Sequence, residues 1–194
     1  MIKLTKLQEK RRSDIINSAT ELFAENGFHS VDMDKIKQKA KVAKATLYSY
    51  FNSKEELYFV CVDNSYDVLF KNISSYTKKA NTVDEFLSLL VDAILEIHTK
   101  ITSTINLMGR INHEMLIEVF QIIEEKKKKY LNDEFKKKLE LLSTKDLNPN
   151  IVFSTIWVSC SYLIYRLNIA PIGNLEEIKT NLLNLFLNGL KIEV

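Results

Sequence analysis

The chain has 194 residues, of which 46% are hydrophobic, so it can bury a core in one large domain or two small ones. Its two cysteines, Cys61 and Cys160, lie far apart and match no metal or redox spacing, which excludes a disulfide framework and favours a reducing, cytoplasmic setting. The net charge of +2 is unevenly distributed: residues 1–54 carry eleven basic and six acidic side chains, a net +5, and the remainder carries −3.

Helical periodicity predicts an all-α fold of about nine helices, because apolar residues recur at steps of three and four and only four glycines and two prolines interrupt the chain. The amino-terminal stretch is basic but lacks an apolar segment, so we predict no secretory signal and a cytoplasmic location. The most hydrophobic stretch, residues 151–165, is shorter than the roughly 20 apolar residues that cross a bilayer. We therefore expect a buried helix there rather than a membrane span, and no membrane partner.

The first predicted helix carries an apolar stripe and ends at Gly27, which is typical of a carboxy-terminal cap. The stripe consists of Ile15, Ile16, Ala19, Leu22 and Phe23. A short second helix is expected to follow, with Asp32 as its N-cap. Its inward positions are Met33, Ile36 and Ala40.

After a tight turn, a third helix is predicted from Lys44 to Phe51, with Leu47 and Phe51 on its buried side. Two short helices joined by so short a turn, behind a longer supporting helix, are typical of a helix-turn-helix unit. The excess of basic side chains in this part of the chain favours binding to nucleic-acid phosphates, although a solvated basic face is a common alternative.

The sequence from Gly27 to Leu57 resembles the amino-terminal DNA-binding domain of the TetR family of bacterial transcriptional regulators. The matching features are Gly27 with the aromatic residue after it, Ile36, Ala40, Val42, and the segments TLYSYF and SKEEL. The resemblance implies a homodimer that binds a palindromic operator in double-stranded DNA, usually to repress, and that responds to a small-molecule inducer. The implied domains are a helix-turn-helix domain at residues 1–54 and a helical regulatory and dimerisation domain at residues 55–194.

The resemblance also implies DNA contacts in and around the third helix. The positions that reach base edges in the major groove match Lys44, Ala45 and Tyr48. The positions that contact phosphates match Ala43, Thr46, Ser49, Tyr50 and Lys54. Helix geometry agrees, because Leu47 and Phe51 lie four residues apart on the inner face and leave the base-reading positions outward. The alternative is that both tyrosines are core aromatics and that the lysines are solvated.

Three residues depart from the family pattern within this unit. Lys41 stands in the turn where glycine is usual, at a position that tends to need a positive φ, so a slightly reshaped turn is expected. Lys37 replaces a common small residue, and Ala45 replaces a glycine that often lets the recognition helix approach the bases. The operator sequence therefore cannot be transferred from a relative.

Beyond Leu57 the chain is predicted to stay helical, and the resemblance implies that its fourth helix moves as a lever. Thr82 and Glu85 form a capping box for a fifth helix. The stripe of that helix consists of Phe86, Leu90, Ile94 and Ile97. A short helix at residues 105–110 and a long helix at residues 112–142 are expected next. The charged run in the long helix mixes both signs, which predicts a solvated face rather than a second DNA site.

The last two helices are predicted from Pro149 to about Asn168 and from a cap formed by Asn174 and Glu177 onward. The stripe of the final helix consists of Leu175, Ile178, Leu182, Leu185, Phe186 and Gly189. Two adjacent helices this apolar exceed what one core can cover, so we expect them to pair with their copies in a four-helix homodimer interface. The alternative is an ordinary buried hairpin.

No catalytic pattern is found in the sequence. The three histidines His29, His98 and His113 are scattered, and neither a nucleophile triad nor a metal-ligand spacing is present, so we predict no enzyme, no metal site and no cofactor. A redox-sensing role for the cysteines is disfavoured, because apolar helical surroundings usually make thiols inert.

An apolar or aromatic inducer would suit a pocket between the fifth and eighth helices, although the same side chains serve equally well as core. The candidate lining residues are Phe86, Leu90, Ile94, Met108, Met115, Phe120, Trp157, Tyr162 and Arg166. Arg166 would pair with an anionic ligand, or else it lies near a helix carboxy-terminus or bridges the dimer. The sequence thus predicts a dimeric repressor released by an inducer; the alternative is a constitutive dimeric DNA-binding or interaction protein without a small-molecule ligand.

Overall fold

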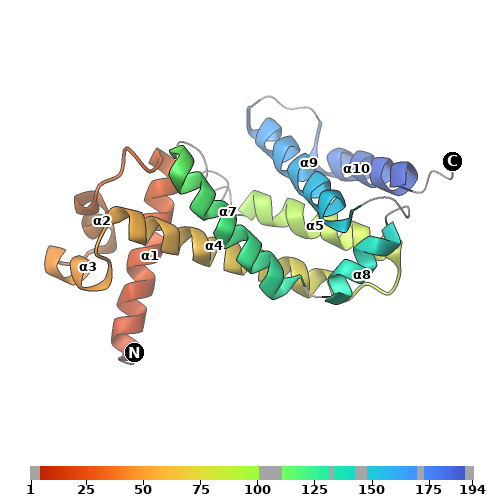
Figure 1. The fold of residues 1–194 in the computed structure, drawn as a ribbon. Helices are drawn as coiled ribbons and strands as arrows, with labels where there is room; N and C mark the ends of the chain where they lie inside the picture. The colour runs from red at the N-terminus through yellow and green to blue at the C-terminus, as the bar shows by residue number, and fades with distance from the viewer. Residues whose placement is uncertain (1–4, 101–110, 132, 143–147, 170–172, 191–194) are drawn as a thin grey trace. The chain divides into compact units, whose positions relative to one another are not determined.

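The computed structural model describes residues 5–100, 111–131, 133–142, 148–169 and 173–190, and over these ranges the chain forms nine helices and no strand (Figure 1). The predicted all-α fold is confirmed. By their contacts the residues form two compact units, one made of Met1–Asp67 with Ile101–Glu125 and the other of Val68–Lys100 with Lys126–Val194. The proposed domain boundary after residue 54 stays a prediction, and the two units are described separately below.

The first unit contains the helices predicted for the amino-terminal part of the chain. They are α1 (Lys6–Asn26), α2 (Met33–Ala40), α3 (Lys44–Tyr50), the first part of α4 (Lys54–Thr77) and the first part of α7 (His113–Tyr130). The third helix ends one residue earlier than predicted, because Phe51 has an extended backbone and closes α3 with its N–H on the Leu47 carbonyl.

Local capping interactions set the ends of the first two helices. Thr5 and Gln8 form a capping box at the start of α1, and Gly27 ends that helix with φ 77° and its N–H on the Phe23 carbonyl. Asp32 caps α2 by accepting a hydrogen bond from the Lys35 N–H at 2.8 Å. The predicted N-cap at Asp32 and the predicted stop at Gly27 are therefore confirmed.

Aromatic packing joins α1 to α4 within the first unit. The ring of Phe23 meets that of Tyr58 edge to face at a centroid distance of 5.4 Å, and Phe28 lies 5.1 Å from the same tyrosine ring. On the other side of α1, Glu21 pairs with Lys39 of α2 at 2.9 Å. These contacts hold α1 against both α4 and α2.

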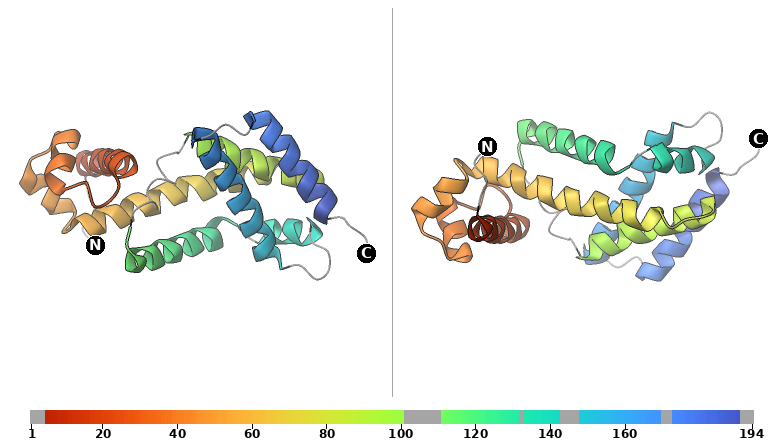
Figure 2. Two further views of the ribbon diagram at one scale, coloured as in Figure 1. Left: turned by 90° about the horizontal axis from the view of Figure 1, so that it is seen from above. Right: turned by 90° about the horizontal axis from the view of Figure 1, so that it is seen from below.

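The second unit is built around α5. Its helices are the last part of α4, α5 (Val83–Lys100), the end of α7, α8 (Asp133–Leu142), α9 (Pro149–Ile169) and α10 (Leu175–Leu190). α5 contacts α8, α9 and α10, and Figure 2 shows α9 and α10 against it in two further views. A salt bridge of 2.6 Å between Asp92 and Lys179 ties α5 to α10. The predicted capping boxes at the starts of α5 and α10 are both present.

The prediction of one long helix at residues 112–142 is wrong. Two helices occupy this range, because α7 ends at Tyr130 and α8 begins at Asp133. Asp133 begins α8, and aspartate favours helix ends over helix interiors because its side chain competes for backbone hydrogen bonds. The short helix predicted at residues 105–110 lies outside the described residues.

Lys41 has φ 54° and ψ 43°, the left-handed conformation, and among the described residues no other non-glycine residue has a positive φ. It keeps the turn after α2 by donating its N–H to the Gln38 carbonyl at 3.2 Å. The conformation that glycine usually provides is therefore retained, and the lysine bears a steric cost in it.

We expect Lys41→Gly to raise the free energy of unfolding by about 0.5–1 kcal/mol, because the relief of left-handed strain outweighs the larger backbone entropy of glycine in the unfolded chain. Urea denaturation would measure the change. Lys41→Ala is the control, since it removes the charged side chain but keeps the strained Cβ, and it should leave the free energy of unfolding within about 0.5 kcal/mol of the parent protein.

Candidate nucleic-acid interface

The α2–turn–α3 unit is held to the first unit by one face of each short helix. Ile36 of α2, Leu47 of α3 and Phe51 just after α3 are each at most 1% exposed. The turn between them is fixed by backbone hydrogen bonds from Lys41 to Gln38 and from Val42 to Lys37. The opposite face of α3 is therefore left toward solvent.

The side chains predicted to read bases lie on that outer face. Lys44 and Ala45 are exposed, and Tyr48 keeps 42% of its surface exposed. Tyr48 is thus not a core aromatic, which removes one of the alternatives for this residue. Tyr50 is half-buried, with its ring 6.5 Å from that of Phe51.

The residues predicted to contact phosphates differ in their exposure and in the hydrogen bonds that they already form. Ala43 is exposed and Thr46 is half-buried. Ser49 is exposed, but its hydroxyl donates to the Thr46 carbonyl at 2.7 Å, so it has to break this bond before it can donate to a phosphate. The DNA-contact roles of these residues stay predictions.

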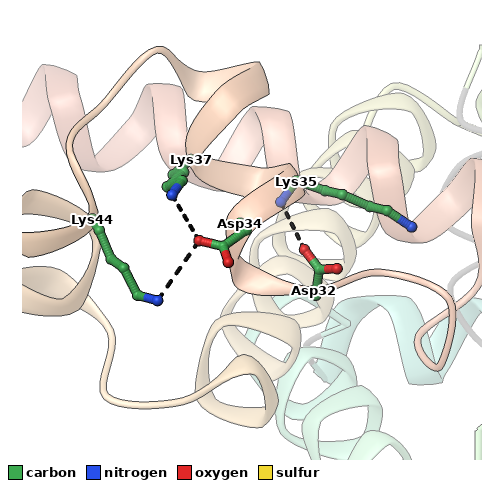
Figure 3. Close-up of polar contacts among 5 residues, drawn as sticks. All are labelled: Asp32, Asp34, Lys35, Lys37 and Lys44. Atoms are coloured by element: carbon green, nitrogen blue, oxygen red, sulfur yellow. Dashed lines mark hydrogen bonds and ion pairs between the residues drawn. The ribbon is translucent and has the colours of Figure 1, made fainter.

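A small charged cluster lies at the junction of α2 and α3. The Asp34 carboxylate is 2.7 Å from the Lys37 ammonium and 3.8 Å from the Lys44 ammonium. Figure 3 shows Asp34 between the two lysines, Lys37 on the same helix and Lys44 at the start of the next. The hydrogen bond from Lys37 and the charges of both lysines hold the pKa of Asp34 below its usual value.

Lys54, at the start of α4, makes its contacts inside the first unit. Its ammonium group donates to the carbonyls of Phe28 at 3.1 Å and Val31 at 3.0 Å, and it lies 4.1 Å from the centre of the Phe28 ring. This side chain therefore ties the beginning of α4 to the loop that leads into α2. The local sequence pattern gives no sign of the link, because 26 residues separate Lys54 from Phe28.

Replacing Lys54 by methionine should lower the free energy of unfolding by about 2 kcal/mol, because two carbonyls lose a charged donor in a partly buried place. Lys35→Met is the control: the Lys35 ammonium also donates to a loop carbonyl, that of Ser30, but the bond is exposed and its loss should cost less than about 1 kcal/mol. Equal stability of the two variants in urea denaturation would mean that the Lys54 link does not stabilise the fold.

The two cysteine thiols are buried and unreactive. Burial raises the pKa of both Cys61 and Cys160 to about 12, and the Cys61 thiol donates to the Ile16 carbonyl at 3.6 Å. Neither side chain forms a thiolate near neutral pH, which weighs against redox sensing. Within the described ranges, no group of three or more histidine, cysteine, aspartate or glutamate side chains is arranged to hold a metal ion.

The candidate pocket residues fall into both units. Phe86, Leu90 and Ile94 are fully buried along α5 of the second unit. An aromatic chain links Phe86 to the half-buried Trp157 through Phe135 and Phe153, with centroid distances of 5.1, 5.7 and 6.2 Å in that order. These residues share one core, and their role in lining a pocket stays a prediction.

The other candidate pocket residues are more scattered. On α9, Tyr162 is 58% exposed and Arg166 is half-buried. Met115 is buried and Phe120 is 52% exposed on α7, in the part that belongs to the first unit. Met108 lies outside the described residues.

The sequence did not predict a groove of about 610 Å³ that lies within the first unit. Its lining residues are Arg12, Glu56, Phe59, Val60, Asp63, Asn64, Glu118 and Ile122. Three carboxylates and one guanidinium lie beside apolar side chains in this lining, unlike the pocket expected for an apolar ligand. Residues from α1, α4 and α7 line the groove, and local periodicity carries no information on which distant helices meet.

None of the helices over the described residues combines the length and the apolar content that a membrane span requires.

Comparison with known proteins identifies the amino-terminal part. Residues 15–61 match the model of the family described as bacterial regulatory proteins, tetR family. The HTH-type transcriptional activator FasR of Mycolicibacterium smegmatis is 29% identical over 89 residues, which cover 46% of this chain and 41% of the relative. The chain spans less than half of the length of the curated relatives that it matches first. These relatives are named as regulators, not as enzymes.

Solved structures resemble the whole fold. The fatty acid degradation regulator FadR from Bacillus halodurans has a TM-score of 0.76 and 23% identity, and the match covers 99% of this chain and all of that one. FadR from Bacillus subtilis, in complex with stearoyl-CoA, has a TM-score of 0.74 and 22% identity over 91% of this chain and 98% of that one. At these identities the likeness establishes the fold.

Proposed function

Since the chain belongs to the TetR family of bacterial regulatory proteins, we propose that it is a homodimeric transcriptional regulator that represses by binding a palindromic operator and is released by a small molecule. The observation that carries the proposal is the exposed face of α3. Lys44, Ala45 and Tyr48 lie on this face, whereas Leu47 is buried on the opposite face of the same helix. A short helix presented in this way can enter a major groove.

Within this proposal the exposed face divides into two functions. Lys44 and Tyr48 read base edges, because an ammonium donates to guanine acceptors and a phenol offers both an apolar ring and a donor, and the Ala45 methyl contacts the bases beside them. Thr46 and Tyr50, which are half-buried beside the exposed face of α3, contact phosphates, as do Ala43 and Ser49 through their backbone or side chain. Lys54 is left out, because its ammonium already serves two loop carbonyls.

We propose that the dimer forms through α9 and α10. Apolar side chains that a single chain leaves exposed support this interface: Ile151, Val158 and Tyr162 on α9 are 63%, 62% and 58% exposed, and Leu185 on α10 is 64% exposed. Leu185 was expected on the same stripe as Phe186, but only Phe186 is buried, so Leu185 is available to a second copy. Pairing by these helices would join two α3 helices in one dimer.

Long-chain acyl-CoA thioesters are the first inducers to test, because a protein of the same fold is described in complex with stearoyl-CoA. The buried apolar side chains along α5 and the Arg166 guanidinium would suit an acyl chain and an anionic head group, respectively.

Selection of bound duplexes from random-sequence DNA by the purified full chain tests the regulatory function. We expect an enriched palindrome with half-sites separated by about one helical turn, roughly 34 Å, or a multiple of it. Operator affinity is then measured with stearoyl-CoA and with free CoA. Release by the thioester alone supports an acyl-CoA inducer, whereas unchanged affinity with both favours a constitutive DNA-binding protein. If no sequence is enriched, the proposed function is wrong.

A further inference from the structure

Two aspartates at the start of α2 have different partners (Figure 3). Asp32 accepts the Lys35 backbone N–H and caps the helix. Asp34, two residues later, directs its carboxylate toward the ammonium groups of Lys37 and Lys44 at 2.7 and 3.8 Å. Asp34 therefore links α2 to the first residue of α3, and the helix does not need it as a cap.

The link is exposed and can exchange partners. The Asp34 side chain keeps 55% of its surface exposed and the Lys44 side chain 61%. Exposed ion pairs are weak and screened by salt, so a guanine or a phosphate can compete for Lys44 when DNA approaches. The carboxylate thus affects the position of the Lys44 ammonium. An acceptor group of the DNA has to replace the carboxylate as the partner of that ammonium.

The carboxylate also stands among the positive charges that attract DNA. Binding to arbitrary sequences is driven by the release of counterions from phosphates that basic side chains neutralise. A negative charge placed beside Lys37 and Lys44 lowers that gain for every sequence. At the matching sequence, a base acceptor at the right position receives a hydrogen bond from Lys44 in place of the carboxylate. This bond restores affinity for that sequence alone.

We propose that Asp34 is a specificity-determining residue: it restrains Lys44 at the junction of α2 and α3 and selects operator over arbitrary DNA by lowering phosphate-driven binding. Asp34 is a positioning residue that acts through Lys44 and needs no contact with DNA of its own. The inference rests on the proposed function and deepens it, because it assigns part of the sequence discrimination to a residue on α2.

The test uses the full chain, a duplex that the parent protein selects from random DNA, and a scrambled duplex of the same length and composition. Asp34→Asn should raise affinity for the scrambled duplex about fivefold more than affinity for the selected one, and should steepen the salt dependence of scrambled-duplex binding by about one unit of slope. The ratio of the two affinities therefore falls about fivefold.

Asp32→Asn is the matched control, because it removes the same charge two residues away while asparagine still caps α2. It should shift both affinities together and keep their ratio. In a Lys44→Ala background, Asp34→Asn should no longer change the ratio, because the proposed effect of the carboxylate on specificity acts through Lys44. Asp34→Ser serves as a second variant that also removes the carboxylate.

The outcomes separate this inference from the proposed function. If the parent protein selects no duplex, the proposed function fails and the inference fails with it. If the parent protein selects a duplex but the Asp34 variants keep the same ratio as Asp32→Asn, the proposed function stands and Asp34 has no role in specificity.

Discussion

Replacing Val158 by aspartate should convert the protein to a monomer and lower its affinity for a palindromic operator by about 100-fold or more. Val158 is 62% exposed in the single chain, so the substitution spares the fold of the protomer. In a two-fold symmetric interface the change introduces a carboxylate from each copy, and burying these like charges without partners is strongly unfavourable. A monomer also loses the second half-site, which binds at a high effective concentration once the first is occupied.

Val68→Asp is the matched control for this prediction. Val68 is 51% exposed on α4, so the same side chain is introduced at similar exposure but on a helix other than α9 and α10. Light scattering and sedimentation at low protein concentration should show a dimer for Val68→Asp and a monomer for Val158→Asp. If the Val158→Asp variant remains a dimer with unchanged operator affinity, the proposal that the dimer forms through α9 and α10 is wrong.

The structural features that the sequence predicted correctly depend on neighbours within four residues. Asp32 begins α2 and Gly27 ends α1 through hydrogen bonds to positions three and four residues away, respectively. The capping box of Thr82 with Glu85 also spans three residues. Leu47 of α3 and Phe51 just after it are buried on one side, as their spacing of four residues predicts. Such interactions are visible in a linear pattern.

The features that the sequence did not predict depend on distant partners. Nothing in the segment around Lys54 indicates that its ammonium meets carbonyls more than 20 residues earlier. Nothing in the local pattern indicates that Asp34 pairs with Lys44, because this pairing requires the turn to bring α3 back against α2. Leu185 has the spacing of a core residue but lies on the outer side of α10. In each case tertiary packing decides which of several locally equivalent positions is used.

Tyr48→Ala should reduce discrimination between the operator and a scrambled duplex by about 1–3 kcal/mol, which corresponds to roughly 5- to 150-fold in relative affinity. Tyr48 is 42% exposed on α3, beside Lys44 and Ala45, so its ring and hydroxyl are available to base edges. Because Tyr48 is not one of the buried core residues, the free energy of unfolding should change by no more than about 1 kcal/mol. Fluorescence anisotropy with both duplexes measures the affinities.

Two further variants give this result a chemical meaning. Tyr48→Phe keeps the ring, so a discrimination equal to that of the parent assigns recognition to apolar contact, and a loss equal to that of Tyr48→Ala assigns it to the hydroxyl. Ser49→Ala is the control on the same exposed face, because the Ser49 hydroxyl already donates to the Thr46 carbonyl, and any effect should be small and equal for both duplexes. If Tyr48→Ala binds both duplexes with the parent ratio, Tyr48 does not read bases and sequence recognition must come from other residues of α3.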